Sequence, residues 1–396
     1  MSQVFWPESF GSSRHITELS IELVKRGWDV TALITNRTYL DSSISIAPKK
    51  GYREGVRYER IKLPALSQKK DLPRLMSGIL LVLNWIFRSP SFKHYDIVII
   101  GTSPPFAYLA LPFIRLFNKN AKLFLWGFDL YPEAIMASGG KLKISLGKLL
   151  KPFTKRSLKK LDYLIDIGPC MRKRYGLYQP TAIKKTLTPW SFIEPSGLNN
   201  SNGADRKPGL TLLYSGTIGF AHDLENFLLL ARELKKRNAS VSLCFAGIGN
   251  KFKNFKKLIH KDDTNITIIN YTNNDEEFQS RVANADIMMI SLKEEYAGIS
   301  VPSKFFGAIA FGKPILYSGS NKSAIFNWMT NNDIGFHLTK KNISATTDIL
   351  IDLEKNKSKL SEMSSRAFTL YNSHHSKKII CDKWSNILME SVNNCN

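Results

Sequence analysis

The sequence predicts a mixed α/β protein of two domains, each built on a parallel sheet. The chain has 396 residues, of which 43% are hydrophobic, and this length exceeds what one hydrophobic core usually serves. In both halves, short runs rich in β-branched residues alternate with helical patterns, as expected for parallel sheets with crossover helices. Residues 195–208, between the halves, are rich in Asn, Ser and Gly, which is typical of a linker. We therefore expect domains over 1–192 and 209–374, a linker over 193–208 and a final helical segment over 375–396.

The N-terminal domain opens with a strand, a loop of small residues and a helix. Residues 2–6 are the end of the strand, 7–13 form the loop, and 16–25 repeat apolar residues at helical spacing until Gly27 closes the helix. A first strand usually has about five or six residues, so we expect the natural protein to begin a few residues earlier, which an intact-mass measurement tests. Further strands are predicted at 29–35, 57–63, 96–100, 122–126 and 161–167, with helices at 72–87, from 106 and from 168.

The C-terminal domain repeats this alternation. Its first strand is followed by a glycine loop and then by a helix, which is the order of a βαβ unit with a ligand loop at the carboxyl edge of the sheet. Neither this loop nor the loop at 7–13 reads Gly-x-Gly-x-x-Gly, so a dinucleotide fingerprint is absent. Strands are predicted at 210–214, from 240, at 265–270, 285–291, 314–318 and 334–338, with helices at 223–235, 302–312, 349–362 and 377–392.

The composition indicates an acidic partner, because the formal net charge is +23. Nucleic acid is not expected, since the chain shows no zinc finger, RNP aromatic pair or arginine-rich arm. Anionic lipid and a diphosphate substrate account for the charge at least as well. The four cysteines lack Cys-x-x-Cys spacing, which fits bystander thiols better than a disulfide framework or a zinc site. No apolar run reaches the ~20 residues that span a bilayer, and we expect a cytoplasmic protein.

Two segments of the N-terminal domain suit a membrane surface. Residues 72–87 are apolar on nearly every side, and this pattern fits a buried core helix and a helix in the lipid interface equally well. Residues 134–161 contain no acidic residue, whereas a solvated helix face normally mixes both signs. A one-signed amphipathic segment of this kind suits an anionic membrane surface. Its basic residues are Lys141, Lys143, Lys148, Lys151, Lys155, Arg156, Lys159 and Lys160.

The stretch 301–314 predicts an anion-binding helix start between two strands. Pro302 suits the first helical turn, Ser303 and Lys304 follow it, and Gly312 is placed to end the helix. The N-terminus of this helix points to the carboxyl edge of the sheet, where its N–H groups suit a phosphate or diphosphate. The alternative is that Lys304 is a solvated surface lysine and Ser303 an ordinary helix-start residue.

Two carboxylates follow the strand at 122–126 in an otherwise basic domain. Asp129 and Glu133 lie where the carboxyl edge of the sheet is predicted, and carboxylates at such an edge can orient or deprotonate a hydroxyl group. The alternative is that Asp129 is the N-cap of the next helix. Both roles are compatible with the sequence.

These motifs resemble the nucleotide-sugar site of GT-B glycosyltransferases of the family 4 type. Pro-Ser-Lys at 302–304, followed by Ala-Phe-Gly-Lys-Pro at 310–314, is similar to the fucosaminyltransferase-like branch that builds bacterial capsule, exopolysaccharide and O-antigen. One position departs from the broader family. Gly307 stands where many members carry a Glu that holds the ribose hydroxyls, so the resemblance leaves Glu294 or Glu295 as the nearest candidate for this contact.

The resemblance implies a GT-B fold of two Rossmann-like domains with parallel sheets facing across a cleft, and a last helix that crosses back to the first domain. The loop at 215–223 is similar to the family's Ser-Gly-Asn-x-Gly-x-x-His-Asp element, with Thr217 in place of Asn. The resemblance implies catalytic roles for Asp129, Glu133 and Lys304. The residues that it implies for donor binding are Gly11, Ser12, Gly216, Thr217, Gly219, His222, Gly247, Glu295, Pro302 and Ser303.

The implied activity is a retaining transfer of a hexosyl or N-acetylhexosaminyl group from a nucleotide sugar, with UDP as the expected nucleotide. The implied acceptor is a polyprenyl-diphosphate-linked saccharide at the inner face of the plasma membrane. Lys304, helix N–H groups and the loop 216–219 would stabilise the leaving diphosphate without a metal. The chain has no Asp-x-Asp pair, and no cofactor is expected.

Two other functions fit parts of the sequence. A nucleotide-sugar epimerase of GT-B fold would need a carboxylate and histidine set at the anomeric carbon, and its soluble substrate would give the basic segment no purpose. A non-catalytic polyanion-binding protein would use the charge alone, and would spread it over the surface rather than concentrate it around 141–174. A salt-dependent DNA-binding assay separates this second function from transfer.

Overall fold

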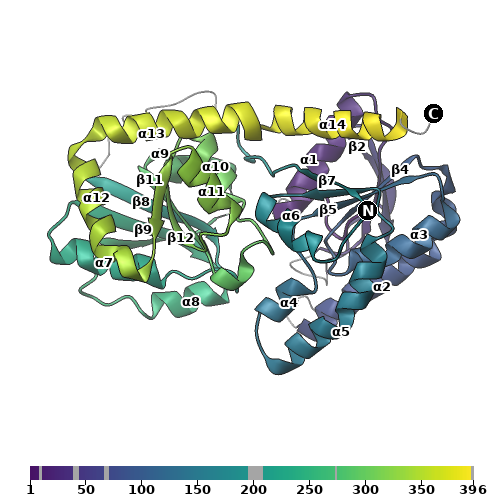
Figure 1. Ribbon diagram of the computed structural model, residues 1–396, viewed down its shortest axis with the longest axis horizontal. Helices are drawn as coiled ribbons and strands as arrows, with labels where there is room; N and C mark the ends of the chain where they lie inside the picture. The colour runs from purple at the N-terminus through teal and green to yellow at the C-terminus, as the bar shows by residue number, and fades with distance from the viewer. Residues whose placement is uncertain (9–10, 39–43, 67–70, 195–207, 273, 394–396) are drawn as a thin grey trace. The chain divides into compact units, whose positions relative to one another are not determined.

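The chain forms two compact α/β units in the computed structural model (Figure 1), which describes residues 1–8, 11–38, 44–66, 71–194, 208–272 and 274–393. Each unit has parallel strands with helices packed on them, which confirms the predicted mixed α/β class. Most of the predicted linker lies outside the described residues. Unit 1 consists of Met1–Thr188, Gly298–Ser300 and Ile380–Asn396, and unit 2 consists of Pro189–Ala297 and Val301–Ile379.

Unit 1 contains two sheets. In the first, of order β1-β3-β2, β1 is parallel to β3 and β2 is antiparallel to it. The second, of order β4-β5-β6-β7, is parallel throughout. The strands are β1 (Thr31–Thr35), β2 (Lys50–Arg53), β3 (Val56–Ile61), β4 (Ile97–Gly101), β5 (Lys122–Gly127), β6 (Tyr163–Asp166) and β7 (Ile183–Thr186).

The first residues of the chain lie between these two sheets. The Ser2 N–H donates to the Leu33 carbonyl of β1 (3.1 Å), and the Gly101 N–H of β4 donates to the Met1 carbonyl (3.1 Å). The backbone at 2–6 is nevertheless not a β-strand, which corrects the prediction for this segment. A cavity of about 150 Å³ borders these residues, β1 and β4. With further bonds from Met1 to Ile99 and from Gln3 to Ser103, residues 1–3 therefore connect the edges of the two sheets.

The helices of unit 1 cover its sheets, and the first one differs from the prediction. Helix α1 begins at Gly11 rather than at Ile16, and buries Leu19 and Leu23 among other residues. The two segments expected to meet a membrane are α2 and α5. The helices are α1 (Gly11–Lys25), α2 (Asp71–Phe87), η1 (Ser89–His94), η2 (Ala107–Ala110), α3 (Leu111–Phe117), α4 (Glu133–Ala137), α5 (Lys141–Leu158), α6 (Pro169–Gly176) and most of α14 (Lys377–Asn393).

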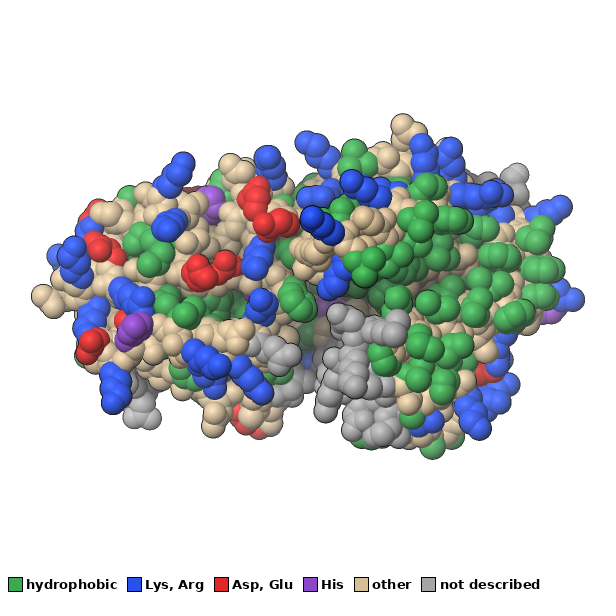
Figure 2. All heavy atoms as spheres, turned by 90° about the horizontal axis from the view of Figure 1, so that it is seen from below, with side chains coloured by type: hydrophobic (Ala, Val, Ile, Leu, Met, Phe, Trp, Pro, Cys, Tyr) green, Lys and Arg blue, Asp and Glu red, His purple; other side chains and the backbone are tan. Residues whose placement is uncertain are grey.

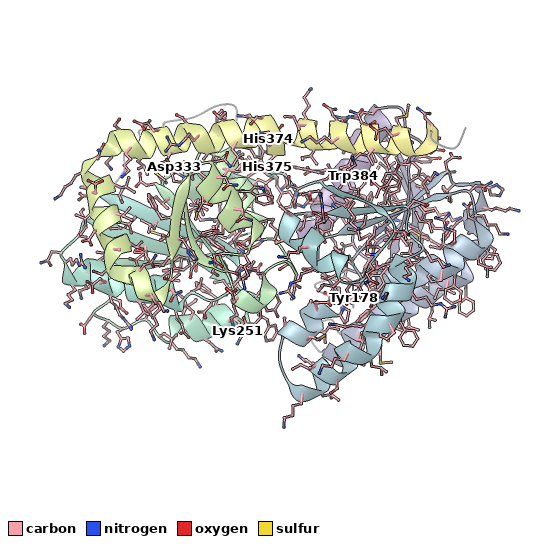
Figure 3. All side chains as sticks on the ribbon, viewed as in Figure 1. Tyr178, Lys251, Asp333, His374, His375 and Trp384 are labelled. Atoms are coloured by element: carbon pink, nitrogen blue, oxygen red, sulfur yellow. The ribbon has the colours of Figure 1, made fainter. Side chains whose placement is uncertain are left out.

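Helix α14 packs on the sheet β4-β5-β6-β7 through Trp384, which is labelled in Figure 3 and fully buried. The ring of Trp384 lies 5.1 Å from that of Trp126 on β5, in an edge-on arrangement. On the same helix, Asp382 forms an ion pair with Arg26 (2.7 Å) beyond the end of α1. These contacts explain why residues 380–396 belong to unit 1.

Unit 2 is built on one parallel sheet of six strands, in the order β10-β9-β8-β11-β12-β13. Helices cover both faces of this sheet (Figure 1). The core contains Leu212, Tyr214 and Phe245 from the strands together with Phe227 and Leu350 from the helices. The strands are β8 (Leu210–Thr217), β9 (Val241–Ile248), β10 (Ile266–Ile269), β11 (Ile287–Leu292), β12 (Ile315–Gly319) and β13 (Gly335–Leu338).

The helices of unit 2 include several that the sequence pattern did not reveal, namely α8, α9 and α11. The single helix predicted at 349–362 is two helices, because the chain turns at Asn356, whose side chain accepts a hydrogen bond from the Lys359 N–H (3.4 Å). The helices are α7 (Glu225–Lys236), α8 (Asn250–Lys256), α9 (Asp275–Ala283), η3 (Glu294–Tyr296), α10 (Lys304–Ala310), α11 (Ala324–Asn331), η4 (Lys340–Asn342), α12 (Ile343–Lys355), α13 (Lys357–Leu370) and η5 (Tyr371–His375).

None of the helices in the described part of the chain has both the length and the apolar character that crossing a membrane requires.

Candidate functional site

The strand order of unit 2 identifies where a ligand would bind. From β8 the chain passes to β9 and β10 on one side, and then returns to β11, β12 and β13 on the other side. The order of the strands therefore reverses between the neighbouring strands β8 and β11. Open α/β sheets bind their ligands at this point. The predicted donor loop at 215–223 follows β8, and Ser291 to Glu295 end β11 and follow it.

Hydrogen bonds hold these two loops together. The Lys293 N–H donates to the Ala221 carbonyl (2.8 Å). The Asp223 N–H donates to Ser291 Oγ (3.2 Å), and His222 Nδ1 lies 2.9 Å from the Ser291 carbonyl oxygen. The loop after β8 is thus fixed to the end of β11 at three successive residues.

Lys304 is the first residue of α10 and reaches back to the glycine loop. Its Nζ donates to the Thr217 carbonyl (3.1 Å) and lies 5.3 Å from the centre of the Tyr214 ring. The side chain keeps part of its surface accessible, but burial of the ammonium group lowers the pKa of Lys304 to about 8. Lys304 therefore still carries a positive charge at neutral pH, at the strand edge where the sequence predicts a diphosphate.

Gly216 leaves the room that Lys304 occupies. Its φ of +131° is rarely adopted by residues with side chains, and a Cβ added there would lie 2.6 Å from Lys304 Cε. Gly247, at the end of β9, is less confined, because its Cβ would lie 3.0 Å from Ile218 and 3.2 Å from Phe252. A Cβ on Gly219 or on Gly11 would meet nothing within 4 Å. Of the four predicted donor-site glycines, Gly216 is therefore the one that both its backbone and its neighbours require.

His222 is neutral in this site. Burial, and then the charge of Lys304, lower its pKa to about 3, although the bond to Ser291 favours the charged form. Because a carbonyl oxygen can only accept, Nδ1 carries the ring proton and Nε2 is an acceptor. His222 can thus accept a hydrogen bond from a sugar or ribose hydroxyl.

Helix α10 is held by an aromatic cluster, so the position of Lys304 is well defined. All of Phe305 to Ala310 is buried. The Phe305 ring lies 5.4 Å from that of Trp328, and the Phe306 ring lies 5.3 Å from that of His375, which is labelled in Figure 3. Of the remaining motif residues, Pro302 is buried, and Ser303 is exposed with its hydroxyl not engaged in capping the helix.

The residue that departs from the family pattern, Gly307, faces α9. A Cβ at Gly307 would lie 3.4 Å from the Phe278 ring, so a Glu there would begin against this aromatic side chain. Glu294 is held at the end of the neighbouring strand, since the Ser320 hydroxyl donates to its Oε1 (2.8 Å). Glu295, the residue favoured from the sequence, is exposed, as Glu294 is. The hydrogen bond from Ser320 fixes the carboxylate of Glu294, which makes Glu294 the better defined candidate for a ribose contact.

In unit 1, Asp129 lies in the loop after β5. The N–H groups of Phe128 and Asp129 both donate to Thr102 Oγ1 (3.1 Å each), and Asp129 pairs through its backbone with Ser300. Burial raises the pKa of Asp129 to about 6. The alternative role as an N-cap is wrong, because α4 begins at Glu133 with Pro132 in the N-cap position.

Glu133, in contrast, is buried against its own unit. The Tyr178 hydroxyl donates to Glu133 Oε1 (2.6 Å), and Lys151 Nζ lies 3.7 Å from the same oxygen. Within the described residues, the other oxygen, Oε2, is buried without a hydrogen-bond partner. Tyr178, which is labelled in Figure 3, thus holds this carboxylate inside unit 1, where its burial leaves it poorly placed to reach an acceptor.

Gly11 and Ser12 are the first two residues of α1, and residues 9–10 before them lie outside the described part of the chain. Gly11 is exposed with a φ of +41°. The buried His15 lies with its Nδ1 3.1 Å from the Gly11 carbonyl oxygen and so holds the first turn. These residues remain predicted donor contacts at the start of a helix.

Sequence reasoning missed three residues that hold the candidate sites, namely Thr102, Tyr178 and Ser291. Thr102 and Ser291 had a detectable signal, because each is a hydroxyl residue at the carboxyl end of a predicted strand. Tyr178 had none, since its partner lies 45 residues away in the sequence. No group of three or more His, Cys, Asp or Glu side chains is placed to hold a metal ion in the described residues.

Comparison with known proteins identifies the fold of the chain. Residues 200–369 match the family model described as Glycosyl transferases group 1. Among solved structures, WaaG, a glycosyltransferase involved in lipopolysaccharide biosynthesis, superimposes with a TM-score of 0.65 and 14% identity over 97% of this chain and 98% of WaaG. Anabaena HepE in complex with UDP and glucose gives a TM-score of 0.61 and 11% identity over 98% and 100%. The likeness to these glycosyltransferases shows the GT-B fold.

A sequence comparison also finds a similar protein. A probable glycosyltransferase of Pseudomonas aeruginosa, WbjE, is 23% identical over 272 residues, which cover 65% of this chain and 66% of WbjE, just under two thirds of that relative. The part of the chain that matches the glycosyl transferases group 1 model, residues 200–369, contains the predicted donor residues from Gly216 to Lys304.

Proposed function

We propose that the protein is a retaining glycosyltransferase of the family 4 type, in its fucosaminyltransferase-like branch. It moves a hexosyl or N-acetylhexosaminyl group from a UDP-linked sugar to a polyprenyl-diphosphate-linked saccharide, in the synthesis of a bacterial surface polysaccharide such as O-antigen or capsule. The observation that carries this proposal is the position of Lys304 and His222 at the switch point of the unit 2 sheet, inside the group 1 domain.

The donor chemistry follows from these two side chains. The bond between the anomeric carbon and the diphosphate oxygen breaks, and the electron pair leaves with the diphosphate. The Lys304 ammonium, with the backbone N–H groups of the loop after β8, is placed to stabilise that charge. His222 Nε2, an acceptor, binds a hydroxyl of the donor. HepE, which has a similar fold, is known in complex with UDP and glucose, and this supports UDP as the nucleotide.

The acceptor chemistry is assigned to unit 1. The attacking acceptor oxygen forms the new bond to the anomeric carbon and loses its proton. With a pKa of about 6, the Asp129 carboxylate is ionised at neutral pH and is basic enough to accept that proton or the hydrogen bond that precedes its loss. We assign Glu133, four residues after Asp129 in the chain, a positioning role, because it is buried and bonded to Tyr178.

The lipid-linked acceptor is supported by the relatives and by the surface. WaaG acts in lipopolysaccharide biosynthesis, and lipopolysaccharide is assembled on a lipid. An acceptor of this kind is held at the cytoplasmic face of the plasma membrane, which would make the protein peripheral to it. Product linkage, determined by NMR, tests retention: an inverted anomeric centre would contradict it.

The first test is a thermal-shift comparison of the purified protein with UDP, GDP, ADP and dTDP. A ligand that binds only the folded state adds about 2.7 kcal/mol of stability at 100 times its Kd. We expect UDP alone to raise the melting temperature, and we expect the shift to disappear in Lys304→Ala. A shift with another nucleotide would replace UDP in the proposal. No shift with any of the four would contradict the donor site.

A further inference from the structure

Helix α5 exposes large apolar side chains at its surface, whereas a helix packed on a folded domain usually turns them toward the core. Its buried residues are Gly147, Thr154, Ser157 and, at its last position, Leu158. Other large apolar side chains point outward, with exposed fractions of 82% for Leu142, 66% for Leu149 and 57% for Phe153, and Leu146 lies between them. These positions follow each other at helical spacing, so they form one exposed apolar stripe along α5.

Specific contacts fix this orientation. A Cβ on Gly147 would lie 2.2 Å from Met136 Cγ, so α4 packs against α5 at a point where only glycine fits. About two turns further along, the Thr154 hydroxyl lies 3.1 Å from the Tyr108 hydroxyl. Turning the helix to bury its apolar stripe would break both contacts. The exposure of the leucines is therefore built into the packing of unit 1.

Two neighbouring helices extend the apolar surface. On α3, Leu116 is 64% exposed, and on α2 Phe87 is 81% exposed. Helix α3 packs against α5, and both α2 and α5 pack against η2. Figure 2 shows hydrophobic side chains gathered on this side of unit 1, with Lys and Arg around them. The exposed apolar residues are Met76, Ile79, Leu80, Leu83 and Phe87 of α2, Phe113, Leu116 and Phe117 of α3, and Leu142, Ile144, Leu146, Leu149 and Phe153 of α5.

We propose that this surface, the α2-α3-α5 face, docks onto an anionic lipid bilayer, with its leucine and phenylalanine side chains inserted in the interface and its lysines on the headgroups. The inference rests on the proposed function, which requires access to a lipid-linked acceptor. Exposed apolar surface of this extent marks an interaction site, and apolar residues combined with basic ones are typical of interfacial helices.

Charge decides between the candidate occupants. From 134 to 161 the chain has no acidic residue, and Lys141, Lys148 and Arg156 of α5 are exposed beside the apolar stripe. A second copy of the protein would bring the same positive charges against each other in a symmetric contact. An anionic bilayer instead offers both apolar chains and negative headgroups, and each basic residue near such a surface strengthens binding.

The test is co-sedimentation of the full chain with two kinds of vesicle, pure phosphatidylcholine and 70:30 phosphatidylcholine–phosphatidylglycerol, at fixed salt and without nucleotide. We expect binding to the anionic vesicles and a fall of about 100-fold in partitioning for the triple variant Leu142→Ser, Leu149→Ser and Phe153→Ser. The matched control is the triple variant Tyr52→Ser, Leu177→Ser and Met389→Ser, which alters equally exposed apolar residues elsewhere in unit 1 and should bind as the unchanged protein does.

A charge variant sharpens the result. Lys141→Gln with Lys148→Gln should weaken binding to anionic vesicles about ten- to thirty-fold and leave the melting temperature unchanged. No sedimentation with either vesicle would overturn the proposal, as would an equal loss in the control variant or a dimer dispersed by the α5 triple variant. A nucleotide-dependent thermal shift without vesicle binding would overturn the docking face alone, and vesicle binding without such a shift would overturn the donor site alone.

Discussion

Lys304 and Asp129 lie at the strand ends of different units, and burial moves both of them toward neutrality. The pKa of Lys304 falls to about 8, and that of Asp129 rises to about 6. Their supports differ. The Lys304 ammonium contacts a backbone carbonyl and an aromatic ring, whereas the Asp129 loop is held by the Thr102 hydroxyl and by backbone pairing with Ser300. Each charge is thus kept where water stabilises it poorly, so each gains from a ligand: an anion for the lysine and a hydroxyl for the carboxylate.

Of the changes that test this difference between the two units, removal of the Lys304 side chain should have the largest effect on the rate of transfer. In Lys304→Ala we expect the rate of transfer to fall about 100- to 1,000-fold, because the leaving diphosphate loses its cation. The fold should remain, since the variant removes a charge that burial disfavours. Initial rates with the UDP sugar measure this, and Lys340→Ala, an exposed lysine of the same unit, is the control. Near-normal turnover in Lys304→Ala would show that the diphosphate binds elsewhere.

Neutralising the carboxylate should come next. In Asp129→Asn we expect about a 100-fold lower kcat, since the amide has the same shape but does not accept the acceptor's proton. If the protein catalyses the proposed transfer, kcat of the unchanged protein should fall as the pH drops through about 6, where Asp129 becomes protonated. A pH–rate profile measures this, and the same acidic decline in Asp129→Asn would assign it to another group.

The same variant has an opposite effect on stability. The folded pKa of Asp129, about 6, exceeds its ordinary value, so between about pH 4 and 6 the folded protein holds a proton that the unfolded chain has lost. Stability of the unchanged protein therefore falls as the pH rises through this window. We expect Asp129→Asn to be more stable by about 1–2 kcal/mol at pH 8 and equal at pH 4. Urea unfolding at both pH values checks this, and a difference that is the same at both would contradict it.

The fit of the glycine loop to Lys304 can be broken without touching either charge. In Gly216→Ala the new Cβ meets Lys304 Cε at 2.6 Å, in a backbone conformation that alanine resists. We expect transfer to fall about tenfold and the free energy of unfolding to fall by about 1–2 kcal/mol. Gly176→Ala at the end of α6, where a Cβ meets nothing within 4 Å, should change neither quantity. Equal behaviour of the two variants would mean that the loop adapts.

The smallest change should come from the support of Asp129. Thr102→Val leaves the N–H groups of residues 128 and 129 without their acceptor, which costs about 1–3 kcal/mol for buried donors. We expect a three- to tenfold lower kcat with an unchanged KM for the UDP sugar. Thr102→Ser keeps the hydroxyl and should restore the rate. A serine variant as slow as valine would indicate that packing of the methyl group, rather than the hydrogen bond, holds the loop.

The structure of unit 2 was easier to predict from the sequence than that of unit 1. Its strands are continuous apolar runs, and the motif from Pro302 to Lys304 occurs between two of them, so chain order alone placed Lys304 at a strand end. The approach of Lys304 to Gly216 could be expected only in outline, because it joins residues 88 positions apart. Helix α9, with its exposed acidic first turn and a single buried residue, offers no apolar stripe by which a helix can be recognised.

Two features of unit 1 could not be predicted from the sequence, for physical reasons. An amphipathic pattern shows that a helix has two different sides, but it does not show which side packs inward. The outward position of the α5 leucines follows from the tertiary contact of Gly147 with Met136. The start of α1 was placed too late, since Gly11 and Ser12 resemble loop residues and their helical state depends on contacts such as His15 with Gly11. In both cases tertiary packing overrides the local preference.

The hydrogen bonds of Met1 and Ser2 impose an order on folding. Met1 and Ser2 bond to Gly101 and Leu33, so about one hundred residues separate Met1 from its partner in the sequence. Contacts of such long sequence separation form slowly, and an unpaired strand edge exposed meanwhile favours association with other chains. In unit 2, β8 pairs with β9, the next strand along the chain. Joining the two sheets is therefore expected to be a slower step of folding than pairing β8 with β9.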